Sequence, residues 1–147
     1  MDFDNRKSFL KLEIIWKDDV MFELQITASN GRYFAKTEVY ETSDSLRDFA
    51  TLLFEFPKLN SNLFHEMGTK DSYAYFSMKY YCIDKFEHLG VEVNLEENVS
   101  TEYRNEEKDK LKLEIIIEPS AIDNFQKELI QLAQKQEGKA TLFGLNN

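Results

Sequence analysis

Two places in the sequence bring an imidazole close to a carboxylate, the combination that acid–base catalysis and metal binding both use. His65 is followed directly by Glu66, and His88 comes four residues after Asp84. Neither spacing matches a recognised catalytic or metal-binding motif, and Asp is common where a chain turns. We therefore interpret Asp84 as a turn residue and predict no catalytic residue and no metal site. An enzyme that uses Asp84 and His88 as an acid–base pair is kept as an alternative.

The single cysteine, Cys82, could be a nucleophile or a metal ligand. It falls on the same side of an alternating strand pattern as Phe76 and Met78, so we expect a buried thiol that only packs. One cysteine and two histidines cannot complete a zinc site without carboxylates. The five glycines form no phosphate-binding or dinucleotide-binding loop. We predict that the protein needs no cofactor.

Alternating apolar and polar residues predict two groups of three strands. In the first group, Asn30-Gly31 is typical of a tight hairpin turn. Short polar turns also connect the other strands of each group, so each group is expected to be an antiparallel meander. The predicted strands cover residues 10–17, 22–28, 32–40, 73–83, 89–95 and 111–118.

Two segments change to the helical period of 3.6 residues. The first helix can be capped by Ser43 and ends at Pro57, and the second follows Pro119 and ends at Gly138. Between the first helix and the next strand, residues 58–72 are expected to form a loop with at most one brief strand.

These elements predict a single α+β domain over residues 1–147, a length typical of one domain. Because each strand has one apolar and one polar face, we predict a single antiparallel meander sheet in a two-layer sandwich. The element order is βββ-α-(β)-βββ-α, with both helices on one face of the sheet, and a closed barrel is the structural alternative. The ordered core is expected at about residues 9–136, with residues 137–147 as a tail.

The open face of this sheet is the best candidate for a binding surface, because Tyr73, Tyr75 and Tyr81 are predicted to share one side of a strand. Tyr is enriched at protein interfaces. The predicted open face also includes Ile15 and Ile116, which suggests a homodimer as an alternative to an outside partner.

Charge favours a basic partner for this surface. The formal net charge is −9, and residues 84–107 hold eight acidic against two basic residues. Such a protein repels nucleic acid and anionic membranes and attracts a basic protein. The candidate partner-binding residues are Tyr73, Tyr75, Tyr81, Glu92, Glu96, Glu97 and Glu102.

The start of the chain lacks the apolar stretch of a signal peptide, and a lone cysteine cannot form an internal disulfide. No uncharged apolar run approaches the roughly 20 residues of a membrane span. We expect a cytoplasmic protein.

The order of elements resembles small bacterial immunity proteins of polymorphic-toxin systems, particularly the WapI-like group and a related uncharacterised family. The resemblance covers most of residues 9–135 and includes the Trp16 strand, Phe56-Pro57, and His88 after the segment Tyr81-Cys82-Ile83-Asp84. It implies a cytoplasmic, non-enzymatic protein that binds and blocks a cognate toxin domain. A nuclease-like toxin would have the basic surface that an acidic protein attracts.

Overall fold

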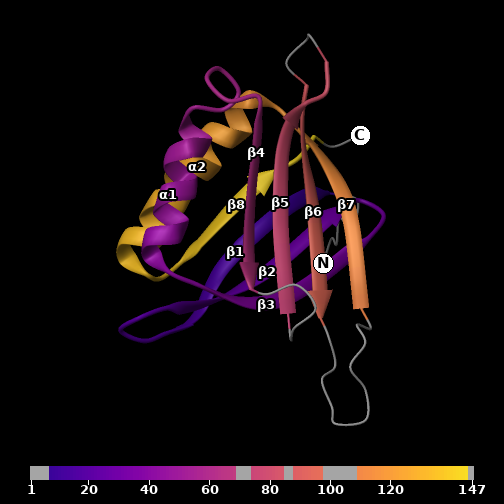
Figure 1. Ribbon diagram of the computed structural model, residues 1–147. Coiled ribbons are helices and arrows are strands. Elements are labelled where there is room, and N and C mark those ends of the chain that lie inside the picture. Colours follow the sequence, from indigo (N-terminus) through magenta and orange to yellow (C-terminus); the bar gives the residue numbers. More distant parts are fainter. Residues whose placement is uncertain (1–6, 69–73, 85–87, 98–108, 146–147) are drawn as a thin grey trace.

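The computed structural model describes residues 7–68, 74–84, 88–97 and 109–145. These residues form eight strands and two helices, so the protein is of the predicted α+β class (Figure 1). The brief strand that the sequence allows within residues 58–72 is β4. In chain order the elements are β1 (Ser8–Lys17), β2 (Phe22–Asn30), β3 (Phe34–Glu41), α1 (Ser43–Phe54), β4 (Asn62–Gly68), β5 (Ala74–Cys82), β6 (Leu89–Glu97), β7 (Asp109–Ile117), α2 (Pro119–Lys135) and β8 (Lys139–Phe143).

The strands form two antiparallel sheets, and the prediction of a single sheet is wrong. Sheet A has the order β3-β2-β1-β8, and sheet B has the order β4-β5-β6-β7. The two predicted meanders are present, but α1 separates them in the chain, and β3 packs on a face of sheet B instead of pairing with its edge. Face-to-face packing buries the apolar sides of both meanders at once. The two-layer α+β sandwich is confirmed with this change.

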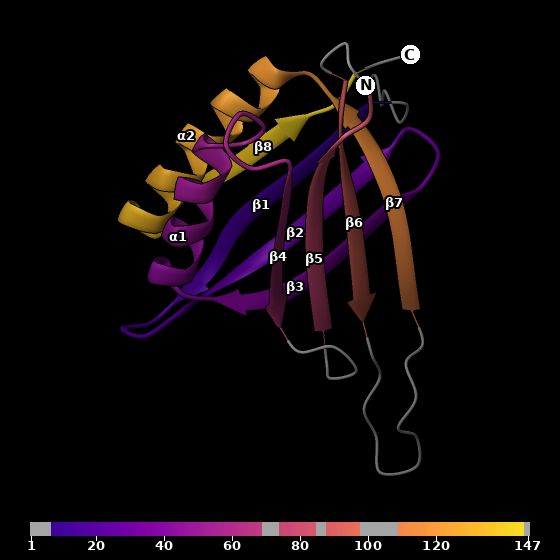
Figure 2. The same ribbon diagram turned by 45° about the horizontal axis from the view of Figure 1, so that its top comes forward.

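The helices lie side by side at one side of the two sheets (Figure 2). α2 packs along β8 of sheet A, and α1 comes close to β4 of sheet B. The predicted apolar stripes of both helices are buried. Together with the inward-facing residues of both sheets they form one hydrophobic core. Its fully buried members include Leu12, Leu24, Ile26, Leu53, Phe76, Val91, Ile115 and Leu129.

A bulge in β1 changes the predicted position of Trp16. The alternating pattern places Trp16 on the core side with Leu12 and Ile14, but the register between β1 and β2 shifts between Ile14 and Trp16. Because successive strand residues point to opposite faces, one extra residue reverses the side on which Trp16 lies. Trp16 is therefore 47% exposed, and its ring packs edge-on against Tyr40 at a centroid distance of 6.1 Å.

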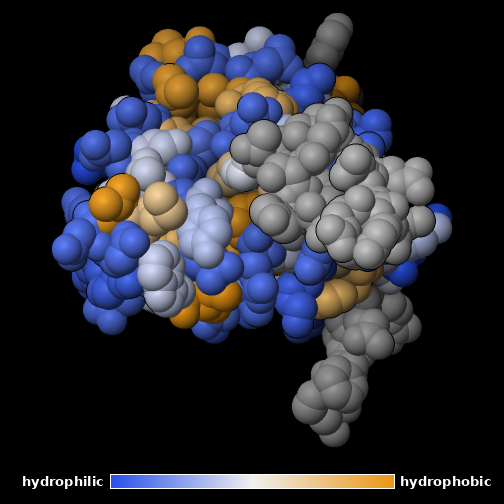
Figure 3. Space-filling model, turned by 60° about the horizontal axis from the view of Figure 1, so that its bottom comes forward, coloured by the Kyte–Doolittle hydropathy of each residue, from blue (hydrophilic) through white to orange (hydrophobic). Residues whose placement is uncertain are grey.

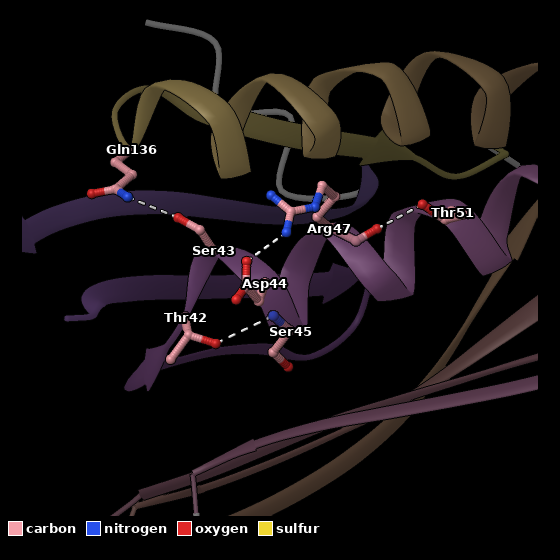
Figure 4. A network of polar contacts seen from close by, with 7 residues as sticks. All are labelled: Thr42, Ser43, Asp44, Ser45, Arg47, Thr51 and Gln136. Atoms are coloured by element: carbon pink, nitrogen blue, oxygen red, sulfur yellow. Dashed lines mark hydrogen bonds and ion pairs between the residues drawn. The ribbon is translucent and has the colours of Figure 1, made fainter.

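The N-cap of α1 is Thr42 and not the predicted Ser43. The Thr42 hydroxyl accepts a hydrogen bond from the Ser45 N–H at 3.2 Å (Figure 4). Ser43 instead accepts a hydrogen bond from the side-chain amide of Gln136, the residue at which α2 ends. The start of α1 is thus tied to the end of α2.

Part of the predicted tail is the edge strand of sheet A. Residues 139–143 form β8 and pair with β1, and Ala140 and Leu142 are fully buried. The alternation in this strand is too short to predict it with certainty from the sequence alone. Beyond β8, Gly144 donates to the Ser8 carbonyl of sheet A, and Leu145 donates to the Ile116 carbonyl of sheet B. These bonds join the two sheets at one corner.

Candidate functional site

Of the predicted binding residues that the structure describes, all but Glu97 lie on the face of sheet B that points away from sheet A. We call this face the outer face. β5, β6 and β7 pair in register, so residues of the three strands stand in rows across it. Its side chains alternate with the buried ones of the core. The outer-face residues are Phe64, Glu66, Tyr75, Ser77, Lys79, Tyr81, Glu92, Asn94, Glu96, Lys110, Lys112, Glu114 and Ile116.

The Tyr81 side chain extends from near the end of β5 across β6 on the outer face. It pairs with Gly90 of β6, and a Cβ atom on Gly90 would come within 2.7 Å of the Tyr81 ring. The ring therefore occupies space that only glycine leaves open, and its hydroxyl donates a hydrogen bond to Glu114 of β7. Burial raises the pKa of Tyr81, and the charges of Glu114 and Glu92 raise it further.

The prediction that Tyr75 is part of an exposed binding surface is wrong. Its side chain is only 7% exposed, so it does not present a ring to a partner. Its hydroxyl donates to Glu66 at 2.9 Å, and burial is the main cause of its raised pKa. Tyr73, the third predicted tyrosine, lies outside the described residues.

The described acidic residues of β6 divide between the two faces of sheet B: Glu92 and Glu96 are on the outer face, and Glu97 is on the opposite face. Glu96 is 6% exposed, and its Oε1 atom has no hydrogen-bond partner among the described residues, so the prediction of an exposed Glu96 is wrong. Glu92 is partly exposed and Glu97 is exposed. Glu102 lies outside the described residues.

Two cross-strand pairs join acid to acid. Glu92 of β6 is directly opposite Glu114 of β7, and Glu97 is directly opposite Asp109. Glu92 and Glu97 are an odd number of residues apart, so the first pair is on the outer face of sheet B and the second is on the opposite face. We call these four residues the acidic ladder. Opposed like charges on neighbouring strands destabilise a sheet. Figure 3 turns the lower side of the molecule in Figure 1 forward, and outside the grey residues it shows mostly hydrophilic surface with separate hydrophobic patches.

A pocket of about 370 Å³ opens beside the Glu97–Asp109 pair, between β3 and the ends of β6 and β7. Its lining includes Glu97, Asp109 and the β3 residue Lys36. β3 is held against β6 here, because the Thr37 hydroxyl donates to the Glu96 carbonyl at 3.2 Å. The walls of this pocket thus come from both sheets.

Asp84 and His88 come together at the turn after β5. Asp84 Oδ2 lies 2.6 Å from His88 Nδ1, and Asp84 Oδ1 accepts the His88 N–H at 3.3 Å. Both side chains are exposed, His88 at 50% and Asp84 at 36%. The contact fits the predicted turn role, and it is open to solvent.

A buried imidazole–carboxylate pair that the sequence does not reveal joins the two sheets. His65 Nε2 lies 2.7 Å from Glu41 Oε2, and these side chains are 13% and 7% exposed. Glu41 Oε1 also accepts the Thr42 N–H, and the His65 ring stacks on Phe49 of α1 at 4.8 Å. The neighbouring Glu66 points to the opposite face of β4, because adjacent strand residues alternate.

Cys82 is exposed at the end of β5, so the prediction of a buried thiol is wrong. The alternation holds along the strand, but the core ends before its last residue. Among the described residues, no group of three or more His, Cys, Asp or Glu side chains could hold a metal ion. In the same part of the chain, no helix is long and apolar enough to cross a membrane.

Comparisons with protein-family models, with curated proteins and with solved structures found no match.

Proposed function

We propose that this protein is a non-enzymatic binding module that recognises a basic protein domain through the acidic ladder of sheet B. The acid–acid pairs Glu92–Glu114 and Glu97–Asp109 are the observation that carries the proposal. Opposed like charges on neighbouring strands cost stability. A cationic side chain bound between two such carboxylates offsets their repulsion. Binding of a cation is therefore favoured by the same repulsion that destabilises the free protein.

The surroundings of the ladder support a protein partner. Tyr81 presents part of a rigid ring beside Glu92 and Glu114, and tyrosine is enriched at protein interfaces. The net charge of −9 would accelerate association with a basic domain at low salt. Tyr75 and Glu96 are buried, so in this proposal they make no direct contact with the partner.

The resemblance to bacterial immunity proteins extends the proposal to a class of partner. In that reading the partner is a cognate toxin domain, and the protein blocks it by covering its basic surface. A nuclease-like toxin needs such a surface to hold its own substrate. Occupation of that surface by the acidic ladder would exclude nucleic acid by competition.

The test begins with capture of bound proteins from the producing cells, followed by purification of the main partner. Its association rate is then measured with the unmodified protein and with the variant Glu92→Gln/Glu97→Gln at two salt concentrations. We expect the variant to associate about tenfold more slowly or worse at low salt, and the difference to shrink at higher salt.

A matched control separates the ladder from net charge alone. Asp48→Asn/Glu137→Gln removes the same number of charges from exposed positions on α1 and after α2. We expect it to associate nearly as fast as the unmodified protein. An acidic partner, or equal rates for the two double variants, would contradict the proposal.

A further inference from the structure

β7 is the last strand of sheet B, and it lies at the outside of that sheet in both ribbon views (Figures 1 and 2). Leu145 N–H donates to the Ile116 carbonyl, so the backbone groups of Ile116 point away from β6. Backbone direction alternates along a strand, and the N–H and C=O groups of Lys112 and Glu114 therefore also point outward. Leu145 occupies this edge at Ile116, and the outward groups of Lys112 and Glu114 are a template for another strand.

We propose that a second copy of this protein pairs with this edge, antiparallel, about a two-fold axis at Leu113. This register places Lys112 of each copy directly opposite Glu114 of the other, so the symmetry forms the ion pair twice. Lys112 and Glu114 are both exposed, and their outward backbone groups are the ones that such a register joins by hydrogen bonds.

The charges select this register over its neighbours. An axis at Lys112 would place the two Lys112 side chains opposite each other, and an axis at Glu114 would do the same for the two Glu114 side chains. Opposed charges stabilise a cross-strand pair and like charges destabilise it. Of these three registers, only the one with the axis at Leu113 pairs Lys112 with Glu114 and places neither residue opposite its own copy.

The free edge of sheet A is a poorer candidate, although β3 carries a similar alternation with Lys36 and Glu38. Sheet B crosses over β3, where Thr37 bonds to Glu96 and the ends of β6 and β7 line a shared pocket. A second copy that approached along β3 would meet these strand ends. The inference concerns the assembly of the protein and does not depend on the proposed partner.

Sedimentation of the full chain over about 10 µM to about 1 mM tests the proposal. We expect a concentration-dependent dimer. Lys112→Glu alone, or Glu114→Lys alone, creates two like-charge pairs and should weaken the dimer about tenfold or more. The double variant Lys112→Glu/Glu114→Lys restores both ion pairs and should restore the dimer.

Lys36→Glu on β3 is the matched control, and it should leave the dimer unchanged. The thermal unfolding of each variant confirms that an exposed substitution has left the fold intact. A monomer throughout the concentration range, single variants that dimerise as the unmodified protein does, a double variant that stays monomeric, or a dimer lost in Lys36→Glu would each overturn the proposal.

Discussion

The buried pair of His65 and Glu41 should contribute more to stability than any other single side-chain contact between the sheets. Glu41 is 7% exposed, so a carboxylate that loses its imidazole partner must stay buried with one hydrogen bond, from the Thr42 N–H. Hydrogen bonds to charged groups contribute about 1.5–3 kcal/mol, and an unpaired buried charge costs more. His65→Phe keeps a ring to stack on Phe49 but removes the hydrogen bond. We expect it to lower the free energy of unfolding by about 2–3 kcal/mol.

A double-mutant cycle separates the contact from the other effects of each substitution. The free energy of unfolding in urea is measured for the unmodified protein, His65→Phe, Glu41→Ala and the double variant. We expect a coupling energy of about 1.5–3 kcal/mol between the two positions. For a chain of this length, the His65→Phe loss corresponds to a Tm that is roughly 4–10 °C lower.

The chain supplies its own control for burial. Asp84 and His88 form the same chemical contact at 2.6 Å, but they are 36% and 50% exposed. Solvent screens such a pair, so the same cycle at Asp84 and His88 should give about 0.5 kcal/mol or less. Equal coupling energies in the two cycles, or a value under about 0.5 kcal/mol for His65 and Glu41, would refute the reasoning from burial.

Three further outcomes follow from the geometry of single positions. Gly144→Ala should destabilise the protein by about 1–3 kcal/mol, measured by urea unfolding, because its Cβ would come within 2.6 Å of the Ile115 side chain; unchanged stability would show that the corner between the sheets can relax. Glu97→Gln should raise the free energy of unfolding by about 0.2–1 kcal/mol through the loss of its repulsion with Asp109, because its other cross-strand neighbour is the uncharged Ala74; a decrease would contradict the repulsive pair. The folded-state pKa of Tyr81 is raised, so the stability that its neutral form provides is complete below pH 10 and is lost as the pH rises above 10. Tyr81→Phe should therefore flatten the fall of Tm above pH 10, and an identical pH profile would count against it.

The alternating pattern predicted most strands because each has one face in the core, and it failed where that condition ends. At Trp16 a bulge reverses the face, and in the apolar run Ile14-Ile15-Trp16 the alternation does not tell which residue is the extra one. Cys82 follows the pattern but lies past the end of the core. The number of sheets could not be predicted either, since alternation tells which side of a strand is buried but not whether a sheet or a helix covers it.

Some residues of the candidate site could be predicted from the local sequence, and others depend on contacts between distant parts of the chain. The concentration of acidic residues within 84–107 is a property of the sequence, and it led to Glu92 and Glu97 directly. Their partners Glu114 and Asp109 depend on the register of β6 and β7, which the sequence alone does not fix. The pairing of His65 with Glu41 joins residues that are 24 positions apart, so no local motif announces it.

The two imidazole–carboxylate pairs and the two acid–acid pairs show opposite uses of charge in one fold. At Glu41 a buried charge is matched by an imidazole and a backbone N–H, which is how a fold retains a carboxylate in its core. At Glu92 and Glu114 two carboxylates meet in register on the outer face, although the Tyr81 hydroxyl donates to Glu114 and Lys79 stands on the other side of Glu92. A sequence under no demand except stability would place a lysine at one of these two positions, as it does at Lys79 on the other side of Glu92. This mismatch is the feature on which the proposed binding of a partner rests.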